Sequence, residues 1–310
     1  RGPLTHNHRE EPMNKNDLKG VIPAIVTPFA EDERVDETAL ATITEYVVNN
    51  GVHGIMTTGG TGEFPLLLRE ERKVVTKIVA EAANRKVPIF AGTAACGTRE
   101  AIMLAEDAAD AGAQAVIVTP PFYFILPEEA LYQHFAELAR NSPLPVVVYN
   151  NPLYTSNNLA PGLIARLAEI DNVIGLKQSQ ADLGQLVEVI RLAGDRISIC
   201  TGIDSQFYAA LCVGAVGIFS TAATICPRHM VDVYDQFANG CQAEARTSHR
   251  RLQSLNRFLE YDPGYVTPAK EALNMMGLPA GRARRPVLEL TDVERSGVRD
   301  ALRELNLLPA

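Results

Sequence analysis

Residues 173–177 read Val-Ile-Gly-Leu-Lys, so an apolar run ends in the lysine Lys177. Lysine is rarely fully buried, and a lone lysine in such a place commonly packs its stem while its ammonium reaches water. Burial instead disfavours the ammonium and makes the free amine available near neutral pH. A free amine can attack a keto group to form a Schiff base, whose iminium draws electrons from the adjacent carbon. Lys177 is therefore either a surface lysine or a nucleophile for chemistry on a keto compound.

Two tyrosines could move protons in such a reaction. Tyr149 lies near the end of another apolar run, residues 145–150, and Tyr123 follows a Pro-Pro pair in the segment 119–124. A buried tyrosine is often a core residue whose hydroxyl is satisfied. A phenol beside a forming carbinolamine can also act as general acid and base, and Tyr123 could extend that relay. Both readings stay open from the residues alone.

A glycine-rich segment offers a binding loop. Residues 57–65 read Thr-Thr-Gly-Gly-Thr-Gly-Glu-Phe-Pro. Its glycines let backbone amides approach a bound group closely, and Thr61 adds a hydroxyl donor. The loop lacks the Gly-Lys-Ser/Thr ending of a nucleotide-binding P-loop, which disfavours phosphate binding. A small carboxylate fits a few amides and one hydroxyl better, although the glycines could also serve a tight turn alone.

These candidates all end or follow short apolar runs, which must be the elements that position them. Eight such runs are rich in β-branched residues and lack period-two alternation, which is typical of parallel strands covered on both faces. They span residues 21–27, 52–58, 87–93, 115–119, 145–150, 173–177, 197–202 and 216–220. Helical segments follow them at residues 36–50, 69–83, 98–112, 127–140, 160–170, 181–194 and 204–214. Successive strand–helix units predict an α/β fold, a (β/α)8 TIM barrel, whose chemistry sits at the carboxyl ends of the strands.

The chain divides into three predicted parts. We expect a flexible N-terminal extension over residues 1–18, the barrel over residues 19–223, and a C-terminal helical region over residues 224–310 that packs on the barrel. Candidate helices in the last part are residues 226–239, 243–259, 267–276 and 291–305. A doubly wound open sheet is disfavoured because no glycine-rich dinucleotide turn follows the first strand. A phosphate-binding isomerase is disfavoured because His53 lies near the start of the second strand, away from the catalytic end.

Composition narrows the class of protein. The 310 residues carry a formal net charge of −8, which disfavours a nucleic-acid-binding surface. The tightest basic cluster, Arg282, Arg284 and Arg285, is expected to be a solvated loop. Five cysteines without paired spacing predict mostly buried, reduced thiols, with neither a disulfide framework nor a metal site. No charge-free window is long enough to span a membrane, and the polar residues 1–12 lack the apolar core of a signal peptide, so we expect a cytoplasmic protein.

In motif and spacing the chain resembles the dihydrodipicolinate synthase and N-acetylneuraminate lyase family, class I pyruvate aldolases that form a Schiff base. The resemblance runs from about residue 19 to about residue 300. It rests on the segments 20–29, 59–72, 91–102, 118–124, 131–135, 149–152, 175–177 and 214–220. It implies a lyase that acts on a pyruvate-type 2-keto acid, needs no metal or organic cofactor, and assembles as a homotetramer.

The resemblance also implies roles for individual residues. Lys177 matches the lysine that forms the Schiff base, and Tyr149 matches the general acid and base. Tyr123 matches a tyrosine that reaches into the neighbouring subunit's site. The residues implied to hold the keto acid are Thr61 with the amides around Gly60 and Gly62, for its carboxylate, and Gly202 and Phe219, whose backbone lines the pocket.

Two positions depart from the family pattern. Gly60 stands where the family loop has a threonine or serine, whose hydroxyl links two tyrosines in the synthases. Tyr154 stands where synthases carry an arginine for the second substrate's carboxylate, and a phenol lacks that bidentate grip. The expected reaction is therefore aldol cleavage or condensation, or dehydration, of a keto-deoxy sugar acid or a related compound. The alternatives are 4-hydroxy-tetrahydrodipicolinate synthase proper and a barrel that binds a keto acid without turning it over.

Overall fold

The computed structural model describes residues 12–260 and 264–309, and eight parallel strands form one sheet within that part of the chain. The strands are β1 (Gly20–Pro23), β2 (Ile55–Thr57), β3 (Ile89–Gly92), β4 (Ala115–Val118), β5 (Val146–Asn150), β6 (Val173–Gln178), β7 (Ser198–Thr201) and β8 (Gly217–Ser220). Each strand coincides with one of the eight predicted apolar runs to within a few residues. All but a few strand residues are buried, because helices cover the outer face and side chains fill the inside.

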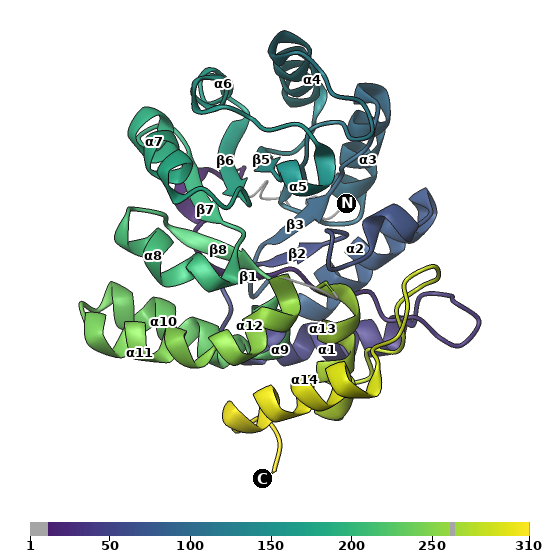
Figure 1. The fold of residues 1–310 in the computed structure, drawn as a ribbon. Coiled ribbons are helices and arrows are strands. Elements are labelled where there is room, and N and C mark those ends of the chain that lie inside the picture. The colour runs from purple at the N-terminus through teal and green to yellow at the C-terminus, as the bar shows by residue number, and fades with distance from the viewer. Residues whose placement is uncertain (1–11, 261–263, 310) are drawn as a thin grey trace, which may run out of the picture.

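The sheet closes into a barrel. Its strands follow the order β1-β8-β7-β6-β5-β4-β3-β2. The remaining seam joins β1 to β2, where the Ile25 amide donates to the Met56 carbonyl at 3.0 Å and the His53 amide donates to the Val21 carbonyl at 2.8 Å. Helices surround the strands (Figure 1). The predicted (β/α)8 barrel is therefore confirmed.

The helices also follow the prediction closely. The barrel carries α1 (Glu37–Asn49), α2 (Arg69–Ala83), α3 (Thr98–Asp110), α4 (Glu128–Asn141), α5 (Pro152–Thr155), α6 (Pro161–Leu167), α7 (Leu183–Ala193) and α8 (Phe207–Cys212). The later helices are α9 (Ala222–Ile225), α10 (Pro227–Ala238), α11 (Gln242–Arg251), α12 (Gln253–Glu260), α13 (Val266–Met275) and α14 (Asp292–Glu304). The helix predicted over residues 243–259 is divided into two elements at the fully buried Leu252, whose backbone angles stay right-handed helical.

The inside of the barrel has its own apolar core, separate from the core between strands and helices. Ile22, Phe90, Val147 and Phe219 fill the inside, and Leu18 packs with them. Gly175 makes room for Leu18, because a Cβ at this position would collide with the leucine side chain. The predicted flexible extension over residues 1–18 stays a prediction, and Leu18 at its end is fully buried.

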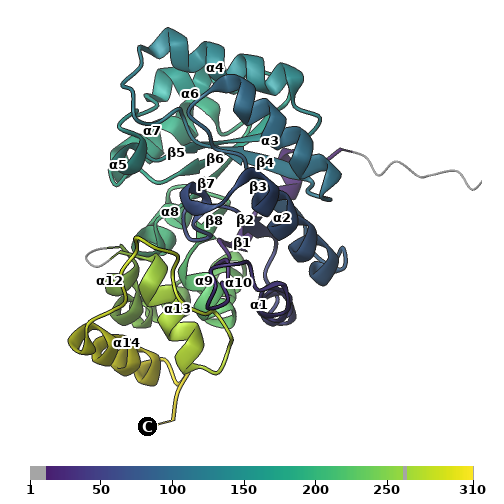
Figure 2. The ribbon, with the colours of Figure 1, turned by 90° about the vertical axis from the view of Figure 1, so that its right-hand side faces the viewer.

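The C-terminal helices lie together on one side of the barrel. Helices α12, α13 and α14 contact one another, and α12 and α13 contact α9, which follows β8. Figures 1 and 2 show the three helices on the β1–β8 side of the barrel, beside α9. No helix in the described part of the chain is both long and apolar enough to cross a membrane.

The cysteines correct one expectation. Cys200 and Cys226 are buried, whereas Cys96, Cys212 and Cys241 are exposed, since the exposed three lie in loops or at a helix end. All five are free. Burial raises the pKa of the Cys200 thiol to about 12, which keeps it protonated. Within residues 12–260 and 264–309, no cluster of three His, Cys, Asp or Glu side chains could hold a metal ion.

Candidate active site

A cavity of about 500 Å³ opens at the carboxyl ends of the strands. Seven of the nine residues predicted from the sequence line it: Gly60, Thr61, Tyr149, Tyr154, Lys177, Gly202 and Phe219. Gly62 lies in the same loop but outside the lining, and its carbonyl accepts a hydrogen bond from the Thr27 hydroxyl at 2.8 Å. The cavity thus gathers residues that lie up to about 200 positions apart in sequence.

Lys177 is held inside this cavity. Its exposed fraction is 5%, and the register of β5 and β6 sets it opposite Tyr149. Its Nζ lies 4.2 Å from the centroid of the Tyr149 ring and 5.7 Å from that of Phe219. No ion pair among the described residues involves Lys177. The reading of Lys177 as a surface lysine does not hold, because its amine is enclosed against two aromatic rings.

Gly202 at the end of β7 leaves the space that Lys177 occupies. A Cβ at Gly202 would collide with Ser179 and would lie 2.6 Å from the Cε of Lys177. Real side-chain contacts do not come that close, so any larger residue would displace the lysine. The Gly202 amide donates to the Gln178 carbonyl at 2.8 Å, which fixes this strand end beside β6. The glycine is thus a steric requirement of the lysine's position.

Tyr149 has a phenol whose orientation is fixed. Its hydroxyl accepts a hydrogen bond from the Asn151 Nδ2 at 2.9 Å. A phenol that accepts a hydrogen bond keeps its own proton to donate, so Tyr149 can give a proton to a group in the cavity. With the Lys177 amine over its ring, Tyr149 is placed to serve as acid and base for a compound that reacts with that amine.

The glycine loop is a compact turn that presents a hydroxyl to the cavity. The Glu63 amide donates to the Gly60 carbonyl at 2.9 Å, and Glu63 adopts a left-handed backbone conformation with φ of 58°. Thr61 is 3% exposed, and its Oγ1 lies 2.8 Å from the Oγ1 of Thr221. The loop glycines leave room for close neighbours, since a Cβ at Gly59 would lie 2.6 Å from the Met56 side chain. Thr61 lines the cavity and brings a hydroxyl to its wall.

A buried ion pair, which sequence reasoning missed, ties this loop to the C-terminal region. The side chains of Glu63 and Lys270 are each 1% exposed, and the lysine Nζ lies 2.6 Å from the Glu63 Oε1. Lys270 lies on α13 and also donates to the Arg282 carbonyl at 2.8 Å. Burial lowers the pKa of Lys270 to about 8, while attraction to Glu63 opposes that change. The pair fixes α13 against the loop that lines the cavity.

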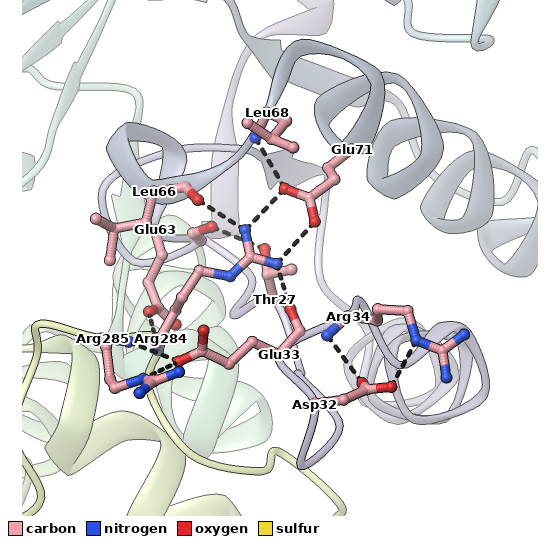
Figure 3. A network of polar contacts seen from close by, with 11 residues as sticks. Thr27, Asp32, Glu33, Arg34, Glu63, Leu66, Leu68, Glu71, Arg284 and Arg285 are labelled. Carbon is pink, nitrogen blue, oxygen red and sulfur yellow. Dashed lines mark hydrogen bonds and ion pairs between the residues drawn. The ribbon is translucent and has the colours of Figure 1, made fainter.

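Arg284 reinforces this connection, which corrects the expectation that its cluster is a solvated loop. Its side chain is 12% exposed and forms an ion pair with Glu71 at 2.7 Å. Its side chain also donates to the Leu66 carbonyl at 2.7 Å, and its backbone amide donates to Glu63 at 2.8 Å (Figure 3). The expectation holds for the neighbouring Arg282 and Arg285, whose side chains are exposed.

We expect Lys270→Met to lower the free energy of unfolding by about 3–5 kcal/mol, because it leaves the Glu63 carboxylate buried without its ion-pair partner. The double variant Glu63→Gln/Lys270→Met removes both charges and should recover much of that loss. Guanidinium-induced unfolding followed by circular dichroism measures both effects. A single variant as stable as the wild type would contradict the importance of this pair.

Asp204 is a second buried carboxyl group that the sequence did not single out. It lines the cavity, is 4% exposed, and accepts hydrogen bonds from the Ser220 hydroxyl and from the amides of Thr221 and Ala222. Burial raises the pKa of Asp204 to about 7, and the nearby Glu260 adds to that rise. Asp204 therefore places a hydrogen-bonded carboxyl group, with a raised pKa, in the cavity wall.

The raised pKa of Asp204 predicts a pH effect on stability. Between its ordinary pKa of 3.8 and its folded pKa of about 7, the folded chain keeps a proton that the unfolded chain has lost. We therefore consider the difference between the unfolding free energies of the wild type and of Asp204→Asn. This difference should fall as pH rises from about 4 to about 7 and should level off above that range. Chemical denaturation of both proteins at pH 4.5, 6 and 7.5 measures the difference, and a constant difference would contradict the prediction.

Tyr123 does not line the cavity of its own chain. It is 87% exposed and has a left-handed backbone conformation with φ of 80°. Its neighbours Phe124 and Ile125 are also exposed, at 65% and 79%. A relay from Tyr149 to Tyr123 is therefore not formed within one chain. The role in a neighbouring subunit's site stays a prediction.

Comparison with known proteins gives consistent results for nearly the whole chain. A model of the dihydrodipicolinate synthetase family matches residues 17–305. The chain is 39% identical over 291 residues to a 4-hydroxy-tetrahydrodipicolinate synthase of Archaeoglobus fulgidus, which covers 94% of this chain and 99% of that protein. It is 36% identical over 293 residues to the enzyme of the same name from Thermodesulfovibrio yellowstonii, with the same coverage.

Solved structures agree with these relatives. The chain matches a pyruvate complex of the chloride-inhibited dihydrodipicolinate synthase of Acinetobacter baumannii with a TM-score of 0.89 and 34% identity, over 94% of this chain and 99% of that one. It matches a prophage protein of the dihydrodipicolinic acid synthase family from E. coli K12, also in complex with pyruvate, with a TM-score of 0.90 and 28% identity at the same coverage.

Proposed function

The chain belongs to the dihydrodipicolinate synthetase family of class I aldolase-type lyases, and we propose that it uses Lys177 to condense pyruvate with an aldehyde, as a 4-hydroxy-tetrahydrodipicolinate synthase. The observation that carries the Schiff-base chemistry is the enclosed Lys177 amine, 4.2 Å from the Tyr149 ring in the cavity. The names of the curated relatives, at 36–39% identity over nearly the full chain, support the synthase reaction.

The proposed first step forms the Schiff base. The Nζ of Lys177 bonds to C2 of pyruvate, and the former carbonyl oxygen takes up two protons and leaves as water. Tyr149 gives a proton to that oxygen and recovers one as the reaction proceeds. Thr61 and the loop around it hold the pyruvate carboxylate through hydrogen bonds.

The proposed second step makes the carbon–carbon bond. Loss of a proton from the pyruvate methyl group converts the iminium to an enamine, which adds to the aldehyde carbon. The aldehyde oxygen takes up a proton and becomes a hydroxyl. Attack on the iminium by water, or by an amine of the product, then breaks the C–N bond and returns the free amine of Lys177.

A second candidate function has its own support in the charges that line the cavity. Lys177 is the one lysine or arginine among the described residues that line it, and Tyr154 contributes a phenol. Asp204 and Glu260 also line the cavity, so a carboxylate on a second substrate finds no further cationic partner there. This favours a substrate whose part beyond the keto-acid group is uncharged and bears hydroxyls, such as a keto-deoxy sugar acid that is cleaved or dehydrated.

A product screen separates these reactions. The purified protein is incubated with pyruvate and a panel of aldehydes, and separately with keto-deoxy sugar acids, and the products are identified by mass spectrometry. Condensation with the amino-acid-derived aldehyde of the synthase reaction supports the first proposal, whereas cleavage or dehydration of the sugar acids supports the second. Adduct formation without any product would favour the keto-acid-binding barrel without turnover.

A homotetramer and a cytoplasmic location remain predictions. The exposed segment of Tyr123, Phe124 and Ile125 supports assembly, because a run of large apolar side chains in water usually marks an interface. Light scattering of the purified chain would measure the oligomeric state.

A further inference from the structure

Tyr265 lies in the cavity beside Gly60, although no sequence pattern singled it out. It precedes α13 in the C-terminal region and lines the cavity together with Lys177 and Tyr149. A Cβ built on Gly60 would lie 2.5 Å from the Tyr265 hydroxyl oxygen and 3.3 Å from its Cζ. The two residues are therefore complementary: the tyrosine hydroxyl fills the space that a side chain at Gly60 would need.

The surroundings of Tyr265 hold it in this position. Its ring packs edge-on against Tyr154 with centroids 5.8 Å apart. Five residues after Tyr265, on α13, Lys270 forms the buried ion pair with Glu63, which follows Gly60 by three residues. The glycine loop and α13 are thus joined by the Glu63–Lys270 ion pair and by the contact between Tyr265 and Gly60. Because these contacts fix the Tyr265 side chain, its hydroxyl is held in a defined position.

We propose that Tyr265 supplies, from the C-terminal region, the hydroxyl that assists Tyr149 in proton transfer at the Schiff base. The inference rests on the proposed function, since it assigns a part in that reaction. Tyr265 acts through Tyr149 and is therefore a positioning residue. When Tyr149 gives up its proton to the departing oxygen, the Tyr265 phenol stabilises the phenolate. The phenolate then takes a proton from the pyruvate methyl group, which restores Tyr149 and forms the enamine.

The chemical state of Tyr265 suits this part. Burial raises its pKa, and the phenols of Tyr149 and Tyr154 add to the rise. A phenol that keeps its proton is a hydrogen-bond donor, and a donor stabilises a neighbouring phenolate. Tyr154 packs edge-on against Tyr265, and burial raises the pKa of Tyr154 as well, so the phenol beside Tyr265 also keeps its proton.

Deuterium exchange into pyruvate tests the inference without a second substrate. In D2O the enzyme should replace the methyl protons of pyruvate with deuterium, which proton NMR follows directly. We expect Tyr265→Phe to slow this exchange at saturating pyruvate by at least about tenfold, because assisted proton transfer is lost. The half-saturating pyruvate concentration and the fraction of Lys177 trapped by borohydride should stay within about twofold. Tyr208→Phe, whose hydroxyl bonds Gln242 away from the cavity, is the matched control and should exchange at the wild-type rate.

A second pair of variants uses the complementarity of the two positions. Gly60→Ser should also slow the exchange, because its Cβ displaces the Tyr265 hydroxyl. In Gly60→Ser/Tyr265→Phe the serine hydroxyl has room, and exchange should recover at least about threefold over Tyr265→Phe. These variants test the inference even if Tyr265→Phe is poorly stable.

The outcomes are distinct. No exchange by the wild type would overturn the proposed function itself. Suppose instead that the wild type exchanges and Tyr265→Phe exchanges at the same rate, or that Tyr265→Phe changes only the half-saturating pyruvate concentration. Either result would leave the proposed function standing and overturn the role of Tyr265.

Discussion

Lys177→Met abolishes turnover while the protein stays folded; this is the largest effect that we expect. The methionine fills the space of the lysine stem beside Met56 and the rings of Tyr149 and Phe219, but it has no amine to bond to a keto carbon. The rate should fall by a factor on the order of 10⁴ or more, as for the loss of other covalent nucleophiles. Steady-state kinetics on the substrate found in the product screen measure the fall.

Two further variants test whether the loss of turnover is specific to the Lys177 amine. Lys177→Arg retains a long basic side chain in the cavity, but a guanidinium cannot act as a nucleophile at neutral pH, so this variant should be as inactive as Lys177→Met. Lys77→Met changes an exposed lysine on α2 and should retain the wild-type rate. Circular dichroism confirms that the inactive variants are folded. An active Lys177→Met protein would show that the reaction does not pass through this amine.

Tyr149→Phe should lower kcat by about 10²–10⁴-fold, the usual contribution of a general acid and base. The ring that packs beside the Lys177 amine is kept and only the hydroxyl is lost, so the effect reports proton transfer rather than packing. Pyruvate should still form a trapped adduct at Lys177, but more slowly. Borohydride trapping at a series of reaction times measures the rate of adduct formation at Lys177, and steady-state kinetics measure kcat.

Asn151 provides the comparison for Tyr149. Asn151→Leu removes the amide that donates to the Tyr149 hydroxyl at 2.9 Å but leaves the phenol in place. Its effect on kcat should be smaller than that of Tyr149→Phe, at about tenfold, because only the orientation of the phenol is disturbed. If Tyr149→Phe retained a rate within threefold of the wild type, another group would have to move the protons.

The sequence predicted the parts of the molecule that local patterns specify. The eight strands follow from runs of β-branched residues between helical segments, and the barrel rule then brings Lys177 and Tyr149 to one rim. Gly202 could be named from the family resemblance alone. The reason for a glycine there, the proximity of its backbone to the Lys177 side chain, is visible only once β6 and β7 are side by side.

Other features depend on contacts that no local pattern encodes. Glu63 and Lys270 are about 200 positions apart, and neither lies in a stretch that suggests a buried charge. Arg284 looked like one member of a solvated basic cluster, because a cluster of charges does not reveal that Glu71 and the Leu66 carbonyl lie beside it. Tyr265 was missed for the same reason: its hydroxyl occupies the space beside Gly60, on a loop that is distant in sequence.

Trapping of the Schiff base tests the central claim most directly. The protein is incubated with pyruvate and sodium borohydride, digested, and analysed by mass spectrometry, with Lys177→Met treated in parallel. The proposed mechanism predicts a reduced pyruvate adduct on the peptide that contains Lys177, at close to one per chain, and none in the variant. An unmodified Lys177 in the wild type, or an adduct that persists on another lysine in Lys177→Met, would contradict it.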